Sequence, residues 1–85
     1  ALDQPKPIYD CEEEGRVVVK VYVNRSGKVI NAVPGEAIPK GPASTTANSC
    51  LLKRAREAAM KTTWQGDANA MDQQMGYIIY NFRKN

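Results

Sequence analysis

The clearest pattern along the chain is the valine-rich segment Arg16–Val23. Successive side chains of a strand point to opposite faces, so this segment would carry only valine on one of its faces. That face comprises Val17, Val19, Val21 and Val23. The opposite face comprises Arg16, Val18, Lys20 and Tyr22. Because β-branched residues favour strands, the segment predicts a strand whose all-valine face lies in the core.

A turn and a second strand are predicted next. Asn24–Gly27 has the composition of a tight hairpin turn, with Gly27 placed to adopt a positive φ. The segment Lys28–Val33 continues as a strand, although its alternation is less regular because most of its residues are apolar. We expect Val29 to face Val23 inside the core.

The middle of the chain changes from loop to helix. Pro34–Pro42 contains three prolines and two glycines, which predicts a loop. From Cys50 onward, apolar residues recur at positions 51, 52, 55, 58 and 59, the spacing of one helical stripe. Asn48 or Ser49 suits the N-cap, and the helix should end near Thr63.

The segment Gly76–Arg83 predicts a last strand. Its core face would carry Ile78, Tyr80 and Phe82, and its other face Tyr77 and Ile79. The order strand, strand, helix, strand predicts an α+β fold of two layers, ββαβ. Because the first strand can pair with the second on one side and with the third on the other, the last strand should be an edge.

The N-terminal residues lack such patterning. Pro5 and Pro7 stiffen the segment Gln4–Tyr9, because proline fixes its own φ and biases the preceding residue towards extended conformations. We expect residues 1–14 to form an extended arm and residues 15–85 to form one small domain. No signal peptide or membrane-spanning segment is recognisable, so we expect the chain to be a piece of a longer protein whose anchor lies upstream.

The charge distribution argues against nucleic-acid binding. The net charge is +3, and the basic residues Lys53, Arg54, Arg56 and Lys61 lie on the predicted helix. A nucleic-acid-binding domain usually has a denser basic stripe interleaved with aromatic residues. A solvated helix face is the simpler interpretation.

The sequence offers little for catalysis. The chain has no histidine, which removes the usual general base and the commonest zinc ligand. Two cysteines alone cannot form a four-ligand zinc site, and the acidic run Glu12–Glu14 lacks the spaced oxygens of a calcium loop. No glycine-rich phosphate loop precedes the predicted helix. We therefore expect a binding module without catalytic residues, metal or cofactor.

Cys11 and Cys50 allow three interpretations. They are two buried free thiols, or Cys50 is a reactive thiol at a helix N-terminus, or the two form a disulfide. The predicted topology favours the disulfide, because the second strand returns to the pole from which the first strand leaves and the helix must start there. A disulfide would indicate an oxidising compartment.

Taken in order, the motifs of the chain resemble the C-terminal domain of TonB proteins, in the variant common in Bacteroidetes-type cell envelopes. The segments that carry the resemblance are Pro5–Tyr9, Cys11, Glu14–Val19, Val23–Ile30, Ser44–Thr46, Ser49–Leu52, Ala55–Thr62 and Gln74–Phe82. They cover nearly the whole chain. Trp64 stands where the family pattern suggests a phenylalanine, and the loop Pro34–Pro42 is longer than usual.

The resemblance implies a three-stranded antiparallel sheet with one helix packed across it. It also implies a periplasmic domain, attached to the inner membrane through an N-terminal segment, that transmits energy from an inner-membrane proton-driven motor. Its partner would be the Ton box, a short extended segment of an outer-membrane transporter, bound by β-strand addition. The alternative is a TonB-like sensor or structural interaction domain of another cell-envelope protein.

The family's binding residues map onto two segments. The peptide-binding edge would be the last strand, Gly76, Tyr77, Ile78, Ile79, Tyr80, Asn81, Phe82 and Arg83. The family's N-terminal arm corresponds to Gln4, Pro5, Lys6, Pro7 and Tyr9. Separately, Val18, Tyr22, Tyr77 and Ile79 should share the second face of the sheet, and such an apolar face is compatible with a weak homodimer.

Overall fold

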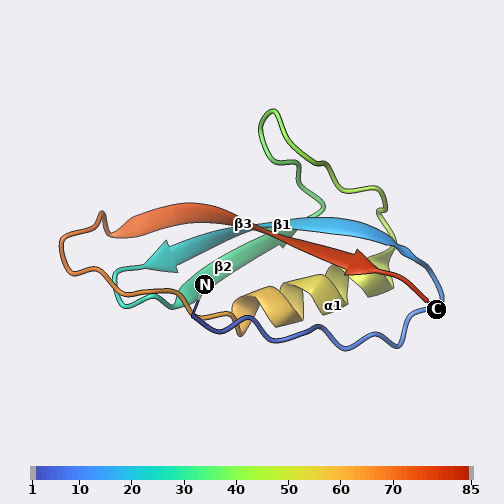
Figure 1. Ribbon diagram of the computed structural model, residues 1–85, viewed down its shortest axis with the longest axis horizontal. Helices are drawn as coiled ribbons and strands as arrows, with labels where there is room; N and C mark the ends of the chain where they lie inside the picture. The colour runs from blue at the N-terminus through green and yellow to red at the C-terminus, as the bar shows by residue number, and fades with distance from the viewer. Residues whose placement is uncertain (1, 85) are drawn as a thin grey trace.

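In the computed structural model, which describes residues 2–84, three antiparallel strands form one sheet and a single helix crosses one face of it (Figure 1). The elements are β1 (Gly15–Asn24), β2 (Val29–Pro34), α1 (Ser49–Met60) and β3 (Gln73–Phe82). The strand order is β2-β1-β3, so β1 is central and β3 lies at an edge. The predicted two-layer α+β fold is confirmed.

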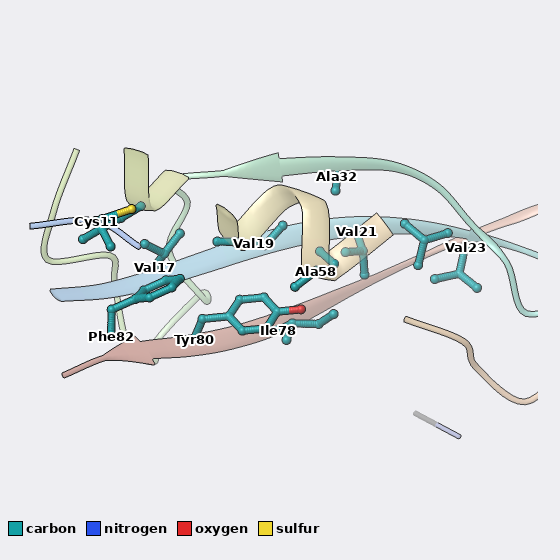
Figure 2. Packing of buried hydrophobic residues seen from close by; sticks show 14 residues of the cluster. Cys11, Val17, Val19, Val21, Val23, Ala32, Ala58, Ile78, Tyr80 and Phe82 are labelled. Carbon is teal, nitrogen blue, oxygen red and sulfur yellow. The ribbon is translucent and has the colours of Figure 1, made fainter. Parts of the chain in front are cut away.

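The core lies between the sheet and α1. All four valines at odd positions of β1 are buried there, as the alternation predicted, and Ile78, Tyr80 and Phe82 join them from β3. Figure 2 shows these side chains in one row, from Cys11 and Phe82 at one end to Val23 at the other. The helix contributes Leu51 and three small residues, Ala55, Ala58 and Ala59. Small residues allow the helix to lie close to the sheet.

The β1–β2 hairpin has the predicted turn and one irregularity. Gly27 has a φ of 87°, and its N–H donates to the Asn24 carbonyl oxygen at 3.0 Å. Val29 pairs with Val23 as expected. The register shifts between Tyr22 and Val23, so that Ile30 becomes the extra residue of a β-bulge.

The helix begins where the sequence indicated and ends earlier. Asn48 is the N-cap, and its side chain accepts a hydrogen bond from the Leu51 N–H at 3.1 Å. The helix ends at Met60 rather than near Thr63. The backbone turns away because Thr63 instead makes short β-bridges to Asp3 of the arm and Lys28 of the hairpin.

The last strand is displaced relative to the prediction. It begins at Gln73, three residues before Gly76, and ends at Phe82, so Arg83 lies outside it. The early start follows from the length of β1, whose end pairs with Gln73 and Gln74. Glutamine is not a strong strand former, so local propensity did not show this extension.

A long loop extends the sheet beyond the end of β2. The Glu36 N–H donates to the Val18 carbonyl oxygen at 3.0 Å, and the Thr45 N–H donates to the Arg16 carbonyl oxygen at 2.9 Å. The chain between these two points rises from the sheet on the side opposite α1 (Figure 1). The loop therefore occupies the β1 edge that the short β2 leaves open.

Candidate peptide-binding edge

The outer edge of β3 can be described residue by residue from the hydrogen bonds of β1. Arg16 and Val18 direct their backbone groups towards the β2 side, where Thr45 and Glu36 donate to them. Along a strand, backbone groups alternate between its two sides, so Val17, Val19 and Val21 bond to β3.

The register then fixes the orientation of β3. Val17 pairs with Tyr80, Val19 with Ile78, and Val21 with Gly76. These β3 residues therefore direct their N–H and C=O groups inward, to β1. The residues between them direct the same groups outward, away from the sheet: Met75, Tyr77, Ile79 and Asn81. Within residues 2–84 no other backbone segment pairs with this edge.

The opposite edge of the sheet is closed. On β2, Val33 pairs with Lys20 and bonds to β1, so Ala32 faces outward. The Ala32 N–H donates to its neighbour Asn31 Oδ1 at 2.9 Å, and the Ala32 carbonyl oxygen accepts from Arg56 Nε at 3.1 Å. Side chains thus satisfy the outward groups of Ala32, in the middle of β2, a common way of protecting an edge strand. Strand addition is therefore favoured at β3.

The N-terminal arm lies along α1, not along the β3 edge (Figure 1). Its beginning is attached through the Leu2 N–H, which donates to the Thr63 carbonyl oxygen at 2.8 Å. Further along, Pro5, Lys6, Pro7 and Ile8 line a small cavity against the helix. At the end of the arm, the Tyr9 ring packs edge-on against Phe82, with centroids 5.2 Å apart. The structure therefore brings Tyr9 next to the end of β3 and keeps the other arm residues on the helix side.

Cys11 and Cys50 form a disulfide, with Cα atoms 5.9 Å apart. Of the three interpretations of the cysteines, the structure matches this one. The bridge joins the end of the arm to the first turn of α1. Asp10 lies beside both sulfur atoms, but this cluster is not a metal centre, because each sulfur is bonded to the other and neither is a thiolate.

Next to the disulfide, one arginine joins the arm to the helix. Arg54 donates to both carboxylate oxygens of Asp10, at 2.9 and 2.7 Å, and to Glu57 at 2.8 Å. These hydrogen bonds lower the pKa of both carboxyl groups and raise the pKa of Arg54. The arginine thus ties the residue before Cys11 to the helix surface.

This cluster predicts a pH dependence of stability. The ordinary pKa values of Asp10 and Glu57 are 3.8 and 4.5, and folding lowers both. Their contribution is therefore complete above these values and is lost as the pH falls through the lower pKa values of the folded state. Arg54→Gln should destabilise the domain at about pH 6 and have little effect at about pH 2.5, measured by urea unfolding. Lys40→Gln is the control, since Lys40 is an exposed lysine of the loop after β2 and influences the pKa of neither carboxyl group. A difference in stability between wild type and Arg54→Gln that is independent of pH would contradict the assignment.

The second face of the sheet carries an apolar surface. Register and alternation place Val18, Tyr22, Tyr77 and Ile79 on it, as predicted. Val18, however, is fully buried, because the loop that follows β2 runs beside it. Ile79 remains 36% exposed. Lys20 lies on this face too, paired with Tyr77, and its Nζ is 5.6 Å from the Tyr22 ring centroid. A lysine over a tyrosine ring makes this face less apolar than the sequence suggested.

Sequence reasoning missed several exposed apolar residues. Ile30 is exposed as the extra residue of the bulge, and Val33 is exposed because it pairs with Lys20 on the face opposite α1. Met75 is exposed in the part of β3 that precedes the predicted strand. It also missed a cavity beside Trp64 at the start of β3. The glycine at position 76, inside a strand, was the signal that could have indicated it.

Among residues 2–84, no helix is long and apolar enough to cross a membrane. Comparisons with family models, curated proteins and solved structures find no match to the chain.

Proposed function

We propose that this chain is the periplasmic domain of a TonB-like energy transducer, which captures the Ton box of an outer-membrane transporter by adding it as a strand to β3. One observation supports this most directly: the outward backbone groups of Met75, Tyr77, Ile79 and Asn81 lack a backbone partner within residues 2–84. Such a row of donors and acceptors is a template for an extended peptide.

The two edges of the sheet differ, and this difference supports the same proposal. Arg56 and Asn31 satisfy the outward groups of Ala32 on β2, whereas nothing comparable protects the middle of β3 within the described residues. Main-chain pairing would accept many peptide sequences, which suits a transducer that serves several transporters. The peptide loses chain entropy on binding, so we expect dissociation constants in the micromolar range or weaker.

The test is a pair of backbone-methylated proteins. Cys50 allows ligation of residues 1–49 to a synthetic peptide of residues 50–85, after which the disulfide is formed. A methyl group on the Ile79 nitrogen should leave the fold intact and abolish binding of a Ton-box peptide, because this N–H points outward. A methyl group on the Tyr80 nitrogen should destabilise the fold, because this N–H bonds to Val17. Unfolding by urea and peptide titration by calorimetry measure the two effects.

The two methylated proteins are controls for each other, because their methyl groups lie on adjacent residues of the same strand. If the Ile79-methylated protein is folded and still binds the peptide as the unmodified protein does, capture at this edge is wrong. If the Tyr80-methylated protein is as stable as the unmodified one, the assignment of inward and outward groups is wrong.

A further inference from the structure

A cavity of about 410 Å³ lies at the start of β3. It is bounded by β3 on one side and by the connection that leads from α1 to β3 on the other. The residues that line it include Val23, Trp64, Ala70, Gln74 and Gly76. Gln74 and Gly76 pair with the core-facing Val23 and Val21, so the cavity lies on the same side of the sheet as α1.

The connection is held away from the β3 edge. The Asp67 N–H donates to the Arg25 carbonyl oxygen at 2.9 Å, and Arg25 Nε donates to the Ala70 carbonyl oxygen at 3.0 Å. Arg25 also forms an ion pair with Asp72 at 2.6 Å. These contacts attach the connection to the hairpin turn between β1 and β2. Because that turn is on the β1 side of β3, the outer side of β3 stays open beside the cavity.

Gly76 forms one wall of the cavity, and the backbone does not require glycine there. Its φ lies outside the left-handed region. A Cβ at this position would be 3.5 Å from Trp64 Cη2 and 3.6 Å from Val21 Cγ2, which are ordinary contacts. A glycine inside a strand often marks a place where another group approaches closely. Here the absent side chain lets the Trp64 ring lie close to the backbone of β3, with the cavity beside them.

Trp64 also differs from a fully packed core residue. Its ring is only partly buried, yet its Nε1 is buried and has no hydrogen-bond partner within residues 2–84. In a well-packed core, most buried donors are satisfied. Together with the adjacent cavity, this unpaired donor distinguishes the corner beside Gly76 from a well-packed core.

A strand added to β3 would lie about 4.8 Å away, with its pleat in phase with that of β3. The peptide residue opposite Gly76 would then project to the α1 side, directly beside the cavity. This holds for either peptide direction, since residues opposite each other in a sheet share a face.

From this geometry we infer that the captured segment is recognised through one bulky apolar side chain, leucine or phenylalanine, which occupies the cavity beside Gly76 and Trp64. The inference rests on the proposed strand addition at β3 and makes it more specific: main-chain pairing holds the segment, and this cavity selects its register. A large side chain there would gain apolar contact with the indole ring.

The experiment uses the transporter peptide that binds the unmodified protein, with each residue in turn replaced by alanine or by phenylalanine. One position should favour phenylalanine over alanine by about tenfold in affinity. Binding of that peptide should shift the emission of Trp64, the single tryptophan of the chain. Ala70→Leu, which fills the cavity from the connection, should remove this preference.

The outcomes separate the two proposals. If peptides bind and methylation of Ile79 prevents binding, but no position prefers phenylalanine or the preference survives Ala70→Leu, the cavity inference is wrong and strand addition stands. If no transporter peptide binds the unmodified protein, both are wrong.

Discussion

Replacing Cys11 and Cys50 together by alanine is expected to lower the free energy of unfolding by about 4 kcal/mol. The disulfide closes a loop with a sequence separation of 39 residues, and this restricts the unfolded chain. For a domain of this size, such a loss corresponds to a fall in melting temperature of roughly 20 °C. Thermal and urea unfolding of the oxidised wild type and of the double variant measure the effect.

The reduced wild-type protein is the matched control, because it retains both sulfur atoms and lacks only their bond. It should lose about as much stability as the double variant. Thiol alkylation followed by mass spectrometry checks the bond itself, and free alkylation of both cysteines in the native oxidised protein would contradict it. The pole near Cys11 should be affected first, since the disulfide and the Arg54–Asp10 pair both hold the arm there.

Gly27→Ala is expected to be the most damaging of the glycine substitutions, with a loss of about 3 kcal/mol. The residue has a φ of 87°, which is costly for alanine. The added methyl group would also overlap the carbonyl oxygen of Trp64. Because the Trp64 N–H donates to the Gly27 carbonyl oxygen at 2.8 Å, relief of the overlap would break the contact between hairpin and connection.

Gly35→Ala distinguishes the cost of the positive φ from the cost of the overlap with Trp64. Gly35 has almost the same conformation, with a φ of 84°, but a Cβ there would meet only Leu52, at 3.8 Å. Its loss should be limited to the conformational cost, about 1 kcal/mol. Urea unfolding of both variants gives the comparison; equal losses would mean that the Trp64 contact has no energetic role.

The elements that the sequence predicted well are those with a strict local pattern. The valines of β1 alternate without interruption, so their buried face was evident, and the position of Gly27 indicated a turn with positive φ. The helical stripe ending at Ala59 was equally clear. The end of the helix was not predicted correctly, because Thr63 pairs with Asp3 and Lys28, which are distant in sequence.

The sequence predicted that the candidate site is a strand, but not which of its backbone groups face away from the sheet. The order of the strands followed from the length and order of the segments. Which β3 residues turn their backbone groups outward depends on the register with β1, and local sequence does not encode that register. The closure of the β2 edge by Arg56, which lies 24 residues from Ala32, was likewise invisible.

The disulfide also determines how the domain would respond to tension. A pull at the N-terminal end of the described chain acts first on the contacts of the arm with Thr63, Arg54 and Phe82, which are few and largely at the surface. Beyond Cys11 the load divides, one part entering β1 at Gly15 and the other passing through Cys50 into α1. The sheet and the helix then bear the force together, because the disulfide ties the chain just before β1 to the first turn of α1.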